Sequence, residues 1–128
     1  MTYHFKYILI FLFFLMLLTP FSSRAGEKWD TADKTLFVAS TVALAGDWLT
    51  TRDMTHRYDE GYHENNVVLG RHPSTQKVDI YFASCAILNY VVTDYLPPKY
   101  RKAWLLVNSA VSLAAINNNL GIGLRFKY

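Results

Sequence analysis

The side chains best suited to chemistry are concentrated in one polar segment, residues 52–77, which holds three of the chain's four histidines. His56 and Glu60 are four residues apart, as are Asp59 and His63, so each pair would share one side of a helix. Imidazole and carboxylate groups are common metal ligands, which leaves metal binding open. The segment has no established metal-ligand spacing such as HExxH, and pairs four apart also serve as surface ion pairs, so we favour a solvated or interfacial face.

Asp47 is the most informative single residue, because a carboxylate within an apolar helix is costly and normally faces a partner or water. Its expected role is either that of a boundary residue capping the loop or that of a partner for Arg52, Asn89 or a loop histidine. The residues expected to carry any activity are Asp47, His56, His63, Glu64, Asn65 and His72.

No motif of nucleophilic catalysis or phosphate binding is present. The chain has no GxSxG sequence and no glycine-rich phosphate loop. Ser74 precedes an apolar segment and is expected to cap a helix rather than to act as a nucleophile. Cys85, the single cysteine, lies in an apolar run and is expected to be a small buried hydrophobe. We therefore predict no catalytic residue and no cofactor, and an enzyme is less expected than a non-enzymatic protein.

Three apolar segments, approximately residues 34–51, 79–96 and 103–120, predict three helices that form an all-α membrane bundle. Each would be roughly 27 Å long, which just spans the apolar core of a bilayer. Small and polar residues recur at helical spacing in each segment, and we expect these stripes to face the neighbouring helices while larger apolar residues face outward. The stripes are Ser40, Ala43, Asp47 and Thr50; Asp79, Ala83, Ala86, Tyr90 and Thr93; and Asn108, Ser112, Ala115 and Asn119.

The connections between these segments also have clear signals. Pro97 and Pro98 stop one helix and predict a tight helical hairpin. Tyr95, Tyr100 and Trp104 lie beside three cations, an arrangement typical of an aromatic belt at a membrane surface. The alternation of apolar with polar or glycine residues in 121–128 predicts a short extended C-terminal tail.

Residues 1–25 have the layout of a secretory signal: basic Lys6, an apolar run, Pro20 and small residues up to Ala25. Cleavage there leaves one domain, residues 26–128, with the polar loop 52–77; an uncleaved segment would add a fourth spanning helix. The chain is 52% hydrophobic and 18% charged, with a net charge of +3 from dispersed residues. This composition favours a membrane and predicts no nucleic-acid partner.

Several segments together resemble a group of small bacterial and phage-associated membrane proteins. They are GDWLTTR (46–52), HENNVVLGRHPS (63–74), VDIYF (78–82), LPPKYRKAW (96–104) and GLRF (123–126). The group shares D-x-x-T, E-x-N-x-x-L-G-x-x-P and Y-R-x-A-W patterns. The resemblance implies the helical membrane layout and transfers no activity and no site residue.

From these observations we expect a non-enzymatic membrane protein of the cell envelope that acts through protein or lipid contacts of its polar loop. The alternatives are a small membrane metal-binding protein or enzyme using the loop, and a phage or mobile-element factor for lysis or superinfection exclusion. The expected partners are membrane lipid and another envelope protein or a second copy of the chain. The expected location is the inner membrane after Sec-type export, with the outer membrane or periplasm as alternatives.

Overall fold

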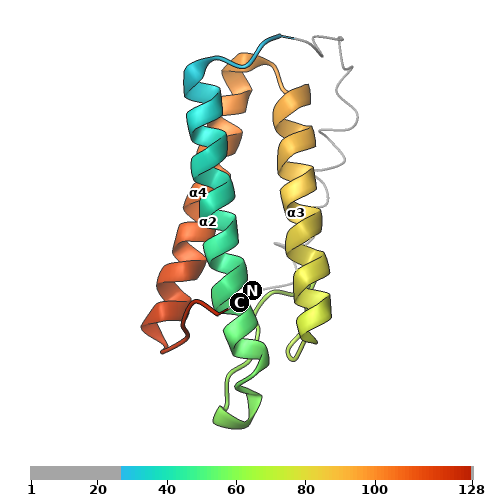
Figure 1. Ribbon diagram of the computed structural model, residues 1–128, viewed down its shortest axis with the longest axis vertical. Coiled ribbons are helices and arrows are strands. Elements are labelled where there is room, and N and C mark those ends of the chain that lie inside the picture. Colours follow the sequence, from blue (N-terminus) through green and yellow to red (C-terminus); the bar gives the residue numbers. More distant parts are fainter. Residues whose placement is uncertain (1–26, 128) are drawn as a thin grey trace.

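Three long helices make up most of residues 27–127, which are the residues described by the computed structural model. They are α2 (Thr31–Thr55), α3 (Thr75–Tyr95) and α4 (Pro98–Gly121), with a short 3-10 helix, η1 (Tyr58–Glu60), after α2 (Figure 1). No strand occurs within these residues, so the all-α prediction is confirmed. The predicted signal, residues 1–25, lies outside the described residues.

The ends of the helices follow from local capping. Asp30 and Asp33 form a reciprocal capping box, in which Asp30 Oδ1 accepts from the Asp33 amide at 2.7 Å and Asp33 Oδ2 from the Asp30 amide at 3.2 Å. Ser74 Oγ accepts from the Lys77 amide at 3.1 Å, which confirms the predicted cap of α3.

Pro98 begins α4, and so the predicted hairpin is confirmed. Helix α2 continues to Thr55 and α3 begins at Thr75, so the loop is shorter than the predicted 52–77.

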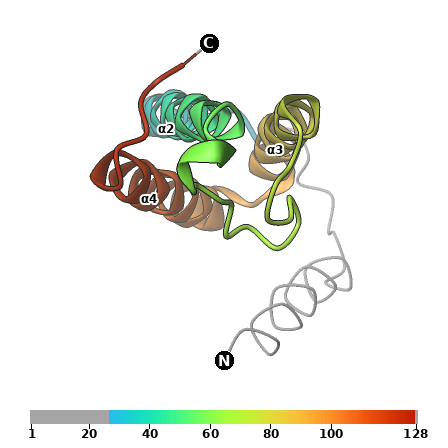
Figure 2. The same ribbon diagram turned by 90° about the horizontal axis from the view of Figure 1, so that it is seen from below.

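Helix α2 is the central element, because it packs against both other helices while α3 and α4 touch each other little (Figure 2). Gly46 allows the close approach of α2 to α4: a Cβ atom at this position would lie 2.8 Å from Ile116 Cδ1. The wider separation of α3 from α4 leaves room between them for a cavity.

The interior of the bundle is largely polar. Ser40, Ala43 and Thr50 on α2 and Ser112 on α4 are buried, as their stripes predicted. The stripe predicted for α3 is confirmed at Thr93, which is buried, and at Asp79 and Tyr90, which contact α2 through Trp48 and Phe37. The helix also turns Val78, Phe82 and Asn89 inward, and it leaves Ala83 and Ala86 exposed. The loop contributes to this rotation of α3, because its Leu69 forms a small apolar cluster with Val78 and Phe82.

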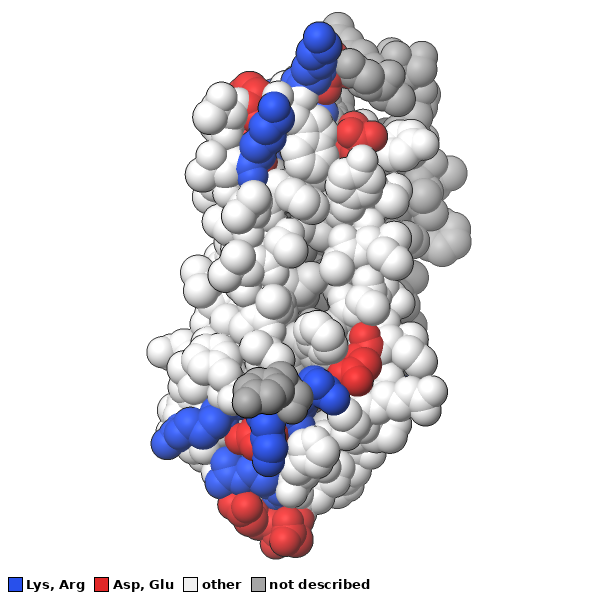
Figure 3. Space-filling view, viewed as in Figure 1, with Lys and Arg blue, Asp and Glu red and all other residues white. Residues whose placement is uncertain are grey.

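The exterior of the middle of the bundle carries no charge. Residues 35–46, 80–93 and 103–121 contain no Asp, Glu, Lys or Arg, and we call their outer surface the uncharged band. On the face shown in Figure 3, charged side chains gather at the two ends of the molecule. Large exposed side chains of the band are Val38, Val42, Ile80, Ile87, Leu88, Tyr90, Val91, Leu106, Val107, Val111 and Leu113.

The sequence-based expectation of three membrane-spanning helices is not supported by the helices themselves. Within residues 27–127, none of the helices combines the length and the apolar character required to cross a bilayer.

Arg101 is fully buried and ties the hairpin end of the bundle together. Its Nη1 donates to Asp33 Oδ2 at 2.9 Å, and its Nε donates to the Thr93 carbonyl at 2.8 Å. Burial opposes ionisation of Asp33, but hydrogen bonds from Arg101 and Lys102 bring the pKa of this carboxyl below its usual value. Arg101 is one of the three cations that the sequence pattern put beside the aromatic residues at a membrane surface. This placement is wrong, because the side chain is buried against Asp33 and the Thr93 carbonyl.

The predicted aromatic belt at this end is also wrong in part. Tyr95 and Tyr100 are exposed, but Trp104 turns inward and its indole Nε1 donates to Asn89 Oδ1 at 3.0 Å. The hairpin end therefore presents two exposed tyrosines and not three aromatic residues.

The C-terminal tail runs back along α2 without forming a strand. Leu124 is fully buried, the Arg125 amide donates to Asp53 Oδ2 at 2.8 Å, and the Lys127 amide donates to the Leu49 carbonyl at 3.3 Å. The tail thereby covers the lower end of the bundle.

We expect the substitution Arg101→Met to lower the free energy of unfolding by about 3–5 kcal/mol, because it leaves the Asp33 carboxylate buried without its main partner. The double variant Arg101→Met/Asp33→Leu should recover part of this loss, since it removes the stranded charge. Chemical unfolding followed by circular dichroism measures both effects. The control is Arg125→Met, at an exposed arginine whose Nη1 donates to the Leu124 carbonyl of its own tail. Equal stability of Arg101→Met and this control would contradict the assignment.

Candidate functional site

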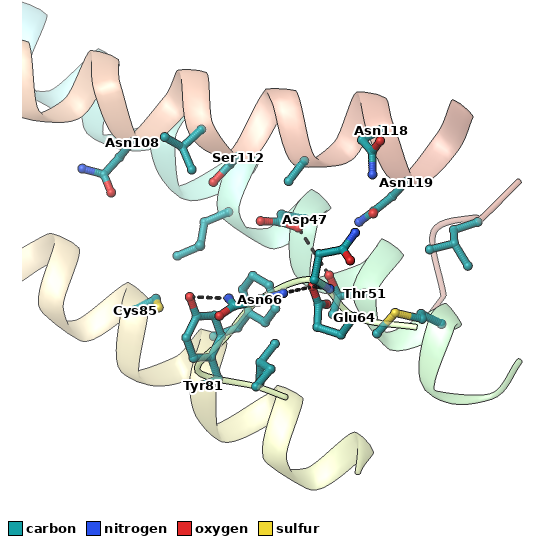
Figure 4. A pocket seen from close by; sticks show the side chains of 18 of the residues that line it. Asp47, Thr51, Glu64, Asn66, Tyr81, Cys85, Asn108, Ser112, Asn118 and Asn119 are labelled. Atoms are coloured by element: carbon teal, nitrogen blue, oxygen red, sulfur yellow. Dashed lines mark hydrogen bonds between the residues drawn. The ribbon is translucent and has the colours of Figure 1, made fainter. Parts of the chain in front are cut away.

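A cavity of about 350 Å³ lies between the three helices and is closed at one end by the loop. Figure 4 shows its polar side chains converging from α2, α3, α4 and the loop. The polar residues that line it are Ser40, Asp47, Thr51, His63, Glu64, Asn65, Asn66, Tyr81, Cys85, Asn89, Asn108, Ser112, Asn118 and Asn119.

Asp47 is placed at the cavity by the inward face of α2. Its Oδ1 accepts a hydrogen bond from Thr51 Oγ1 at 3.3 Å, one helical turn further on. Burial raises the pKa of Asp47 to about 7; the Thr51 hydrogen bond opposes this rise, and the nearby Glu64 carboxylate adds to it. The predicted pairing with Arg52 or Asn89 is wrong, because Arg52 lies against Asp79 and Asn89 bonds to Ser40 and Trp104.

The loop forms the wall of the cavity opposite Asp47. Glu64 Oε1 accepts from the amides of Asn65 and Asn66, both at 2.8 Å, so the carboxylate shapes the turn that carries it. Asn66 Nδ2 donates to the Tyr81 hydroxyl at 2.9 Å and thereby fastens the loop to α3. Burial raises the pKa of Tyr81, so its hydroxyl is protonated and able to donate into the cavity.

Helix α4 contributes amides and a hydroxyl to the cavity, but no ionisable group. Asn119 Nδ2 donates to Thr50 Oγ1 at 2.9 Å, and Asn108 Nδ2 donates to the Trp104 carbonyl at 2.9 Å. In both residues one N–H of the amide is used within the bundle and a second remains, and the amide oxygen can accept from a ligand.

Among residues 27–127, the lining contains the carboxylates of Asp47 and Glu64 and no lysine or arginine. The ion pairs among the described residues lie elsewhere and involve Asp30, Asp33, Asp53, Glu60 and Asp79. The cavity therefore offers anionic and neutral acceptor groups without a cation to balance them. Such a site is suited to binding a polar or cationic group.

The structure brings four of the six residues proposed from the sequence to this cavity: Asp47, His63, Glu64 and Asn65. His56 is the C-cap of α2 and is exposed. His72 packs edge-on against the Tyr58 ring, with 4.8 Å between the ring centroids, and does not line the cavity.

The residues of the possible metal site do not lie on one helix, as their spacing would require. Because α2 ends at Thr55, the pairs His56/Glu60 and Asp59/His63 do not share a helix, and Glu60 instead forms an ion pair with Arg57 at 2.7 Å. Among residues 27–127, no three His, Cys, Asp or Glu side chains are grouped so that they could hold a metal ion.

Several residues of the cavity were not among the sequence candidates. Four of them could have been recognised from the sequence, because each is a polar residue within an apolar helix. They are Asn89, Asn108, Ser112 and Asn119. Cys85 is half-buried at the cavity, and burial raises the pKa of its thiol. Asn66 and Tyr81 gave no signal, because only the folded loop brings them together.

Comparisons of the chain with protein-family models, curated proteins and solved structures gave no match.

We expect Asp47 to make the protein less stable as the pH rises from about 4 to 7. Its carboxyl is protonated in the folded state over this range but ionised in the unfolded chain, so folding takes up a proton and stability falls as protons become scarce. The loss is at most about 4 kcal/mol for a shift of three pKa units. Thermal unfolding at pH 4 and pH 8 measures it.

The matched variant is Asp47→Asn, which should remove this part of the pH dependence and be more stable than the wild type at pH 8. Asp59→Asn, at an exposed residue outside the cavity, should leave the pH dependence unchanged. A wild type and an Asp47→Asn variant with the same pH dependence would show that Asp47 titrates normally.

Proposed function

We propose that the protein is a non-enzymatic, membrane-associated module of the cell envelope that contacts lipid through its uncharged band. The observation that carries the proposal is the inverted distribution of side chains. Asn89, Thr93 and Ser112 are buried in the bundle, whereas Val42, Ile87 and Val107 are at least 60% exposed on its surface. A bundle in water normally has the opposite distribution.

This distribution, with polar residues inside and large apolar residues outside, is the one that helix packing within lipid favours. Lipid gives helices no hydrophobic reason to associate, so small residues and hydrogen bonds between helices must hold them together. The bundle has both: Gly46 lies against Ile116, and Asn89 Nδ2 donates to Ser40 Oγ at 3.0 Å in the buried interface of α2 and α3. An exposed apolar surface of this extent marks an interaction site.

The inward polar groups also account for the modest apolar character of each helix. Asp47, Asn89 and Asn108 lower the hydropathy of their helices, yet they lie at the cavity and not on the uncharged band. Export by the predicted signal would deliver such a bundle to an envelope membrane. The loop would then lie at one end of the band, with its exposed Val67 and Val68 available for a protein contact.

We expect the tagged full-length chain to stay in the membrane fraction after an alkaline carbonate wash. The triple variant Val42→Lys/Ile87→Lys/Val107→Lys should be released, because each lysine costs about 3 kcal/mol within the apolar layer. Fractionation followed by immunoblotting measures the distribution.

The control is Val67→Lys/Val68→Lys/Tyr100→Lys, which replaces equally exposed apolar residues outside the uncharged band. This variant should remain in the membrane fraction. Release of the wild type by carbonate, or retention of the band variant together with its control, would overturn the proposal.

A further inference from the structure

We propose that the cavity between the three helices binds a small organic cation, a protonated amine, whose ammonium group pairs with Asp47. This inference is independent of the proposed membrane association, because it rests on the interior of the bundle and not on its surface.

The size and shape of the cavity suit a small organic molecule. Its volume of about 350 Å³ falls within the range of small-molecule sites. Leu44, Leu69 and Phe82 contribute apolar groups to the lining, and Figure 4 shows Asp47, Thr51 and Glu64 close together beside the loop. A ligand with one charged end and a short hydrocarbon body matches both kinds of group.

The charge of the lining selects a cation. Asp47 and Glu64 face the same cavity. In the part of the chain that the structure describes, no lysine or arginine lines this cavity and neither carboxylate belongs to an ion pair. A partly buried carboxylate without a counter-charge is costly, so a bound cation would be stabilised by supplying that charge.

The neutral groups supply acceptors for an ammonium ion and do not suit a metal ion. An ammonium group donates three hydrogen bonds and needs acceptors around it. Asn108 and Asn119 each use one N–H of the side-chain amide within the bundle, and their amide oxygens can accept from such a group. Hard divalent cations require six or more oxygen ligands in a tight shell, and the described residues hold no group of three His, Cys, Asp or Glu suited to a metal.

Binding should depend on pH through Asp47, since only its ionised form pairs with ammonium. The titratable groups that face the cavity beside it are His63 and Glu64 from the loop and Tyr81 and Cys85 from α3, whereas α4 contributes none. Because burial raises the pKa of Asp47, affinity should increase from pH 6 to pH 8 as this carboxyl loses its proton.

The test is isothermal titration calorimetry of the purified full chain at pH 8 with n-butylammonium. The neutral probe 1-butanol and the anionic probe butyrate have similar size. We expect a millimolar dissociation constant for butylammonium, at least about tenfold weaker binding of the two other probes, and weaker binding of butylammonium at pH 6.

Two variants assign the binding to this cavity. Asp47→Asn should abolish detectable binding of butylammonium, and Glu64→Gln, which keeps an oxygen for the Asn65 and Asn66 amides, should weaken it. Asp59→Asn, at an exposed carboxylate outside the cavity, should bind like the wild type. Circular dichroism confirms that each variant is folded.

Equal binding of butylammonium and butanol would identify an apolar site and overturn the proposal, as would undiminished binding by Asp47→Asn. No heat of binding with butylammonium, or binding of magnesium or calcium chloride in its place, would do the same. The fractionation experiment does not share these outcomes, so either proposal can fail alone.

Discussion

The structure depends above all on the buried guanidinium of Arg101. One side chain reaches Asp33 at the start of α2, the Thr93 and Leu96 carbonyls at the end of α3, and the first turns of α4, to which it belongs. The carbonyls at a helix end have no partners within their own helix, and Arg101 supplies two of them with donors. The charge is retained because Asp33 balances it and Lys102 lies 3.1 Å from the other Asp33 oxygen. The hairpin end is thus held by these polar bonds together with the ring contacts among Trp29, Phe37 and Tyr90.

A bundle joined in this way can keep α3 and α4 apart along much of their length. Contacts of α2 with both neighbours supply most of the packing, and Gly46 brings α4 close to it. The loop then fastens the lower end of α3 through Leu69 and through the hydrogen bond between Asn66 and Tyr81. The space that remains is the cavity. Its polar lining and the polar interhelical contacts belong to the same interior, so the groups that hold the helices together also form the candidate site.

The same arrangement accounts for the apolar exterior. Because polar residues such as Ser40, Asn89 and Ser112 occupy much of the interior, only a few large apolar residues are buried and most of the others lie on the outer surface. The uncharged band is therefore the counterpart of the polar cavity, and charged residues are left to the two ends of the molecule (Figure 3). The proposed contact with lipid concerns the outer surface of the three helices, and the proposed binding of an amine concerns the cavity between them.

The sequence by itself determined the three long helices of residues 27–127, the Pro97–Pro98 hairpin, the Ser74 cap and the inward stripes of α2 and α4. Caps, proline and helical periodicity act over a few residues, so they can be recognised locally. It also singled out Asp47 and Glu64, because burying a carboxylate in or beside an apolar segment is costly unless the carboxylate faces a partner or water. Only the tertiary structure decided the rotation of α3, the burial of Arg101 and the meeting of Asn66 with Tyr81. Each of these depends on residues distant in the chain: Leu69 packs on α3, Asp33 lies 68 positions from Arg101, and the loop must fold back before it reaches the cavity. A local sequence pattern cannot specify such contacts, because they stabilise the protein only after folding has brought separate elements together.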